Sequence, residues 1–208
     1  MSLSEKEKAM IRPIIAALAS AVMLAPTAAL AHTGHGDAAG FTYGIAHPIS
    51  GIDHVLAMVS VGLLAALIGG RALWLLPLTF ISVMAGAAVL GMTGFDLPSF
   101  EVWIAGSLVA LGLAVAYPSH LSSLTGAGLI AVLAVFHGYA HGAEMPAGAS
   151  GLAYAAGFVM GTVLLIGIGT GAALLAGIKG GQLGPRVLRG GGGAAIGLYG
   201  LAALSVAL

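Results

Sequence analysis

The chain has 208 residues, of which 59% are hydrophobic and only 7% are charged, and its formal net charge is zero. Soluble domains carry about 25% charged residues, so this chain lacks the charged side chains that a water-facing surface needs. The mean hydropathy of +1.07 therefore predicts an all-α integral membrane protein. The neutral charge argues against nucleic acid as a partner, and the absence of cysteine excludes disulfides and thiolate metal sites.

Residues 1–31 have the features of a secretory signal peptide. Lys6, Lys8 and Arg12 form a basic start, and an apolar run follows over Ile14–Leu24. The sequence Ala29-Leu30-Ala31 then provides an A-x-A cleavage site. We expect cleavage there, with an uncleaved first transmembrane helix as the alternative. Residues 32–208 are expected to form a single polytopic membrane domain.

Six apolar stretches follow, and each is long enough to cross a ~30 Å hydrocarbon core, which takes about 20 residues. Turn or charge signals separate them. The predicted fold is thus a bundle of six transmembrane helices after an N-terminal signal peptide. The spans are expected at Pro48–Gly69, Leu73–Met92, Phe100–Tyr117, Leu121–His141, Ala153–Gly177 and Gly191–Leu208.

Basic residues between the spans predict the orientation. If the mature N-terminus is periplasmic, all four of these residues fall on cytoplasmic loops, which is the positive-inside pattern. We therefore expect a multi-pass protein of the bacterial inner membrane. The residues are Arg71, Lys179, Arg186 and Arg189.

Pairs of small residues four positions apart are expected to let helices pack closely. They are Gly157/Gly161, Gly167/Gly171 and Gly193/Gly197. The oligomeric state, including a homo-oligomer, is left open. A phosphate-binding loop is absent from the sequence, which argues against ATP-driven pumping by this chain alone.

Ionisable residues within membrane spans are costly and usually functional. The first such segment runs over His47–His54. Pro48 is expected to open a helix. His47 and His54 would then be two turns apart on one face, with Asp53 beside that face. Met58, one turn deeper, is expected in the core.

The second segment contains His137 and His141, which are at positions i and i+4 and share a helix face. Glu144 continues the same stripe if the helix continues. The pair ends a helix that runs outward, so the helix dipole favours a cation there. Two imidazoles in this spacing are a familiar metal-chelating pair.

Four histidines and two carboxylates on one side of the membrane predict a site for a divalent metal ion. A proton relay, or histidines that only bridge helices, are the alternatives. Glu101 opens the third span and is either a further ligand, a partner that orients an imidazole, or an exposed interfacial residue. His32, which would begin the mature chain, could chelate through its amine and imidazole or simply belong to a plain polar leader. His120 is expected in a cytoplasmic turn, as a plain loop residue or as an exit ligand.

The two polar segments resemble the HupE/UreJ family of nickel permeases. The resemblance rests on H-x5-D-H at His47–His54 and on F-H-G-x-A-H-G-x-E at Phe136–Glu144. It extends to the Ala29–His32 leader and to Glu101. The resemblance implies a small secondary carrier or facilitator of nickel, in some members cobalt, that serves hydrogenase or urease assembly. Imidazole and carboxylate ligands suit Ni²⁺, Co²⁺ and Zn²⁺ alike, so the preference for nickel comes from the family.

Three functions compete on the residues alone. Metal transport needs no enzyme activity, and the sequence favours it. An intramembrane metal-dependent hydrolase would use the same residue types, with one metal position left to an activated water. A membrane metal sensor or chaperone would bind the ion without carrying it across.

Overall fold

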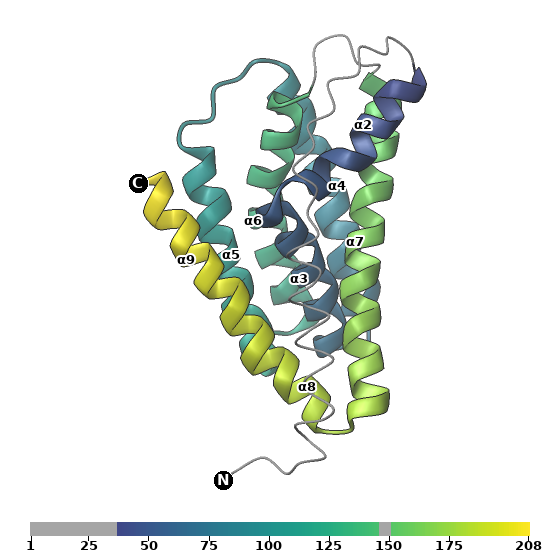
Figure 1. Cartoon of the computed structure of the whole chain (residues 1–208), viewed down its shortest axis with the longest axis vertical. Coiled ribbons are helices and arrows are strands. Elements are labelled where there is room, and N and C mark those ends of the chain that lie inside the picture. The colour runs from purple at the N-terminus through teal and green to yellow at the C-terminus, as the bar shows by residue number, and fades with distance from the viewer. Residues whose placement is uncertain (1–36, 146–150) are drawn as a thin grey trace. The chain divides into compact units, whose positions relative to one another are not determined.

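The computed structural model describes residues 37–145 and 151–208, and helices make up nearly all of this part of the chain (Figure 1). No strand occurs among these residues, which confirms the all-α class. The predicted signal peptide and His32 lie outside the described residues. Their cleavage and chelation stay predictions.

Eight helices and two short helical turns follow one another along the described part of the chain. The helices α4 to α7 match four of the predicted spans to within a few residues. The last span begins earlier than predicted, at Leu183. The elements are α2 (Asp37–Ser50), α3 (Ile52–Ile68), α4 (Ala72–Met92), α5 (Phe100–Ala116), a 3₁₀ turn (Pro118–His120), α6 (Ser123–Ala143), α7 (Gly151–Gly180), α8 (Leu183–Val187), a π-helical turn (Leu188–Gly192) and α9 (Gly193–Ala207).

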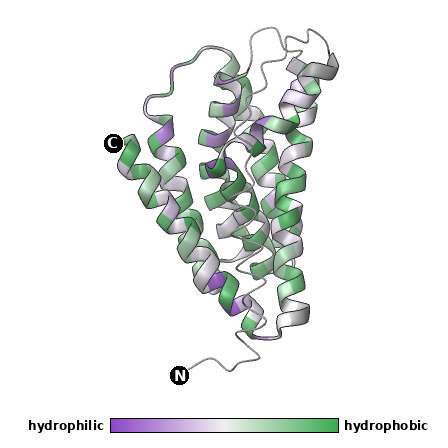
Figure 2. Cartoon of the chain, in the orientation of Figure 1, coloured by the Kyte–Doolittle hydropathy of each residue, from purple (hydrophilic) through white to green (hydrophobic). Residues whose placement is uncertain are grey.

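The lengths and composition of these helices make the chain a multi-pass membrane protein. Among the described residues, four helical stretches are long and apolar enough to span a bilayer: α4, α6, α7 and Leu183–Ala207. Gly40–Ser50 of α2 and Ile52–Ile68 form a bent pair, which is either a fifth, broken span or a re-entrant loop, whereas α5 is apolar but has only 17 residues. Large apolar side chains such as Trp74, Val132 and Ile168 are exposed, as lipid-facing residues are. Green, hydrophobic positions accordingly recur along the helices, and purple, hydrophilic positions are few (Figure 2). The six-span count stays a prediction.

The first predicted span is not one helix. Pro48 lies inside α2, near its end, and the chain bends by 83° between α2 and α3. The expectation that Pro48 opens the span was therefore wrong, and the break falls at Gly51. Gly51 is extended, with φ −102° and ψ 122°. A Cβ atom on Gly51 would lie 2.6 Å from Asp53 Oδ1 and 2.8 Å from His54 Nδ1, so the absence of a side chain lets those two groups fold back over the bend.

The long helix α7 supports both halves of the bent pair. Helix α2 packs on the first half of α7 and α3 on the second (Figure 1). At Gly157 the α7 backbone lies against the α2 backbone at Phe41, and at Gly62 the α3 backbone lies against α7 at Ile166. These approaches are close enough that a methyl group would overlap the facing backbone. The single long helix α7 therefore contacts both α2 and α3 and stabilises the bend between them.

Small-residue packing is confirmed at two of the three predicted pairs. Gly157 and Gly161 face α2, and Gly193 and Gly197 face α5. The prediction was wrong for Gly167 and Gly171, since a Cβ on either would meet no atom within 4 Å. Gly169, which lies between them, faces the α3 backbone instead. The spacing of a glycine pair does not say which side of a helix is covered.

The different surroundings of Gly167 and Gly169 allow a matched test of packing on α7. We expect Gly169→Ala to destabilise the protein by about 1–3 kcal/mol, because its methyl group would overlap the carbonyl of Val59. Gly167→Ala adds its methyl group in open space and should be neutral or slightly stabilising, because alanine favours the helix. Thermal unfolding of the two purified variants in detergent compares them. Equal unfolding temperatures would contradict the α3–α7 contact.

The three arginines of the described residues gather at one end of the bundle. Arg71 lies at the turn between α3 and α4, and Arg186 and Arg189 lie beyond the end of α7. Because α3 and α7 run in parallel, these two turns lie at the same end (Figure 1). His120 is exposed in the 3₁₀ turn between α5 and α6, as expected for a loop residue. The cytoplasmic placement of this end stays a prediction.

Candidate metal centre

The bend between α2 and α3 places three of the predicted residues together. His47 is in the last turn of α2, and Asp53 and His54 are in the first turn of α3. His47 and His54 were predicted to share one face of a continuous helix, with Asp53 beside that face, and that geometry was wrong. Ser50 Oγ instead donates a hydrogen bond of 2.7 Å to the carbonyl oxygen of His47 at the bend. The last turn of α2 presents the negative end of its dipole, which suits a cation, and Asp53 offsets the positive start of α3.

Helix α6 supplies His137 and His141, which are 0% and 1% exposed. The glycine that follows each histidine explains why the two imidazoles are so deeply buried. Gly138 and Gly142 lie against the α4 backbone at Met84 and Ala88, where a Cβ atom would overlap a carbonyl oxygen. Histidine and glycine thus repeat together every four residues, so one face of α6 packs on α4 while the neighbouring face presents imidazoles. Helix α6 ends at Ala143, with Glu144 as its cap.

The four imidazoles come from three helices and form one contact chain in the order His47, His141, His54 and His137. The ring centroids of His54 and His141 are 4.2 Å apart, and those of His47 and His141 are 4.8 Å apart. His54 and His137 lie 5.3 Å apart and nearly perpendicular. The structure thus brings together the four histidines of the two polar segments. We name His47, His54, His137 and His141 the histidine cluster.

Several ring nitrogens of the cluster have no hydrogen-bond partner among the described residues. His54 Nδ1 lies 2.9 Å from Asp53 Oδ1, and His137 Nε2 lies 2.8 Å from Ser107 Oγ. The other nitrogen of each ring is buried, and neither has a hydrogen-bond partner among the described residues. Both ring nitrogens of His141 are likewise buried, and neither has a hydrogen-bond partner among the described residues. Buried polar atoms without partners cost free energy, and such atoms in native proteins call for an explanation, which a bound ion would provide.

Asp53 defines the tautomer of His54. A carboxylate can only accept, so His54 Nδ1 must donate its proton to Asp53. The neutral ring then has its lone pair on Nε2, which is one of the buried atoms without a partner. Carboxylate–imidazole pairs of this kind orient metal-binding histidines in other proteins. Asp53 therefore orients His54 as well as contributing charge.

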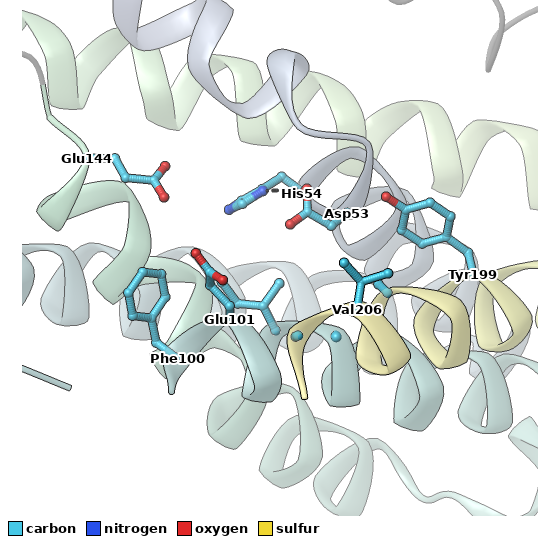
Figure 3. A pocket seen from close by; sticks show the side chains of 11 residues that line it. Asp53, His54, Phe100, Glu101, Glu144, Tyr199 and Val206 are labelled. Carbon is cyan, nitrogen blue, oxygen red and sulfur yellow. Dashed lines mark hydrogen bonds and ion pairs between the residues drawn. The ribbon is translucent and has the colours of Figure 1, made fainter. Parts of the chain in front are cut away.

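A pocket of about 490 Å³ adjoins the cluster and collects the carboxylates. Asp53, Glu101 and Glu144 line it together with His54, and their polar groups face a common space (Figure 3). Glu144 Oε2 also lies 3.4 Å from His47 Nε2, which links the pocket to the cluster. Glu101 opens α5, as predicted, and is exposed on the pocket wall, and its role stays a prediction. The far wall comes from the C-terminal part of α9, including Tyr199 and Val206.

The donor set suits a borderline divalent ion, because imidazole nitrogen and carboxylate oxygen bind Ni²⁺, Co²⁺ and Zn²⁺. Among the described residues, no group of three or more His, Asp or Glu side chains is arranged so that it could hold a metal ion. The imidazoles meet as rings, mostly edge to face. Binding an ion would therefore require side-chain rotations that point the free nitrogens at one position.

Sequence reasoning missed several neighbours of the cluster. Phe158 lies 4.3 Å from the His141 ring, and Tyr154 lies 5.9 Å from the His47 ring, both measured between centroids. Ser107 contacts His137, and Tyr199 reaches the pocket from α9. Aromatic, serine and glycine residues are common in membrane helices, so no local pattern marked these four. Met58 is fully buried in the core, as predicted.

Together, the apolar helices and the buried histidine cluster define a multi-pass membrane protein with a polar site inside its bundle. Comparison with known proteins narrows this class. The chain belongs to the HupE/UreJ family, since the family described as HupE / UreJ protein matches residues 20–203. It is similar to Protein HupE of Rhizobium leguminosarum bv. viciae, with 42% identity over 185 residues that cover 88% of this chain and 94% of that protein. No solved structure matches the chain.

Proposed function

We propose that this protein is a secondary transporter or facilitator that imports a divalent transition metal ion, Ni²⁺ above all, across the bacterial inner membrane. One observation carries the proposal. Four buried ring nitrogens without partners come from α3 and α6 beside a helix break, next to a pocket lined by three carboxylates. Broken helices with polar groups at the break are a common way to build ion sites within membranes.

The pocket and the cluster would act in sequence. Glu101 and Glu144, with Asp53 behind them, would attract the cation at the outer side. The histidine cluster would then replace its water ligands with nitrogen ligands. Import needs no ATP, because a doubly charged ion moving toward a negative interior gains about 4–5 kcal/mol per 100 mV. A role as a carrier rather than an enzyme agrees with membership in the HupE/UreJ family, whose members the resemblance implies to be metal carriers.

Family membership supports nickel over the other ions that the donors would accept, with Co²⁺ or Zn²⁺ as competitors. It also supports a link to hydrogenase or urease maturation, which the resemblance to this family implies. We include His47, Asp53, His54, His137, His141 and Glu144 among the residues that bind the ion on its path, with Glu101 as a further capture residue. His32 would add to capture from the N-terminus.

Purified protein in proteoliposomes tests this function. With an inside-negative potential, radiolabelled nickel should accumulate well above the level in empty liposomes, and excess cobalt should compete. Accumulation should fall when the potential is collapsed. Binding of nickel without any accumulation would favour a metal sensor or chaperone and would contradict transport.

The pocket carboxylates give a graded prediction. Glu101→Gln and Glu144→Gln should each raise the half-saturating nickel concentration, by about tenfold, because removing one nearby charge weakens attraction of a dication by roughly 1.4 kcal/mol. The maximal rate should change less. Asp96→Asn, an exposed residue between α4 and α5, is the matched control and should leave both quantities unchanged. A lower maximal rate with an unchanged half-saturating nickel concentration would contradict a capture role for these carboxylates.

A further inference from the structure

Ser107 lies on α5, is 1% exposed, and belongs to neither polar segment of the sequence. Its hydroxyl makes two contacts. Ser107 Oγ lies 2.7 Å from the carbonyl oxygen of Ile104 and 2.8 Å from Nε2 of His137. A hydroxyl has one proton to donate and lone pairs with which to accept.

The direction of both hydrogen bonds follows from this chemistry. A carbonyl oxygen can only accept, so the Ser107 hydroxyl proton must go to Ile104. Ser107 Oγ can then only accept from His137, which requires the proton of the neutral imidazole to be on Nε2. The lone pair of His137 is consequently on Nδ1, and Nδ1 is the buried nitrogen that has no partner in the described part of the chain.

We infer that Ser107 is a positioning residue, which fixes His137 in the Nε2–H tautomer so that Nδ1 is free to bind the transported ion. This rests on the proposed function, and it deepens that function by naming the liganding atom. His54 is held in the opposite tautomer by Asp53, with Nε2 free. Two different hydrogen-bond partners thus leave a free lone pair on each of two imidazoles in contact.

Ser60 provides a matched control. It is a fully buried serine on α3 whose hydroxyl also bonds a backbone carbonyl, that of Leu56. None of its described hydrogen bonds goes to a histidine. Ser60→Ala and Ser107→Ala therefore remove the same group from similar surroundings, and only Ser107→Ala removes an acceptor from an imidazole.

Nitrogen NMR of metal-free protein with isotope-labelled histidine reads the tautomer directly, with His137→Ala used to assign the signal. The wild type should show His137 protonated on Nε2, Ser107→Ala should show a tautomer mixture, and Ser60→Ala should match the wild type. Ser107→Thr keeps a hydroxyl and should keep the wild-type tautomer. A wild-type His137 protonated on Nδ1 would overturn the inference without any variant.

Nickel titration of the same proteins supplies the second readout. Ser107→Ala should bind nickel about 10- to 100-fold more weakly, the usual cost of losing an outer partner of a metal-binding histidine. Ser60→Ala should be unchanged and Ser107→Thr largely restored. If the wild type binds and transports nickel and Ser107→Ala binds it equally well, the inference is wrong and the transport function stands. If the wild type itself fails to bind nickel, the proposed function fails.

Discussion

Replacing His137 by alanine should abolish nickel uptake while leaving the protein in the membrane at near normal levels. His137 is fully buried, and its free nitrogen lies within the histidine cluster. Loss of an outer partner typically costs 10- to 100-fold in metal affinity, so loss of an imidazole ligand should cost at least about 100-fold. His54→Ala should have the same effect. The measurement is uptake normalised to the amount of protein in the membrane.

The protein should tolerate these changes because other residues hold the helices together. Helix α6 is fixed on α4 by Gly138 and Gly142, whose backbone contacts do not involve the imidazoles. Removing a polar ring whose nitrogen has no partner also removes a cost of burial. His120→Ala is the control, because His120 is exposed in the turn at the other end of α6. Equal loss per molecule in His120→Ala would contradict a localised site, and loss of the protein itself in His54→Ala and His137→Ala would favour a structural role.

Asp53→Ala should reduce uptake by two to three orders of magnitude. Two effects add in this variant. The His54 Nδ1–H loses its acceptor, which costs about 10- to 100-fold through the orientation of the ring. The pocket also loses one of its three carboxylates, which costs roughly another tenfold in attraction of the cation.

Asp53→Asn separates these two effects. An amide oxygen can still accept from His54 Nδ1, but it has no charge, so this variant should recover part of the uptake. Uptake across a nickel concentration series, normalised to membrane protein, compares the two variants with Asp96→Asn. If Asp53→Asn and Asp53→Ala are equally impaired, only the charge of Asp53 matters and its orienting role is wrong.

Much of the architecture could be predicted because apolar runs indicate the membrane helices, and turn or charged residues indicate where they end. The lengths of α4, α6 and α7 followed from apolar runs, and the core position of Met58 followed from helical spacing. Proline misled at the first span. Pro48 suits a helix start, yet here it lies near the end of α2, which ends at Ser50 before the extended Gly51.

The cluster members could be predicted, but their arrangement could not. Ionisable residues in apolar segments are rare enough to stand out, so His47, His54, His137 and His141 were found from the sequence. Their meeting depends on an 83° bend and on α6 lying against α4, which are tertiary features. Ser107 was missed for a related reason: a serine in an apolar helix carries no signal until its neighbour on another helix is known.

Nickel K-edge X-ray absorption of the purified, nickel-loaded protein tests most directly whether the cluster binds the transported ion. The spectrum of the wild type should show the multiple-scattering pattern of several imidazole ligands, with oxygen completing the shell. His137→Ala should lose imidazole scattering or nickel itself, and His120→Ala should match the wild type. A wild-type spectrum with oxygen ligands only, or one unchanged by His137→Ala, would contradict the histidine cluster as the site of ion binding.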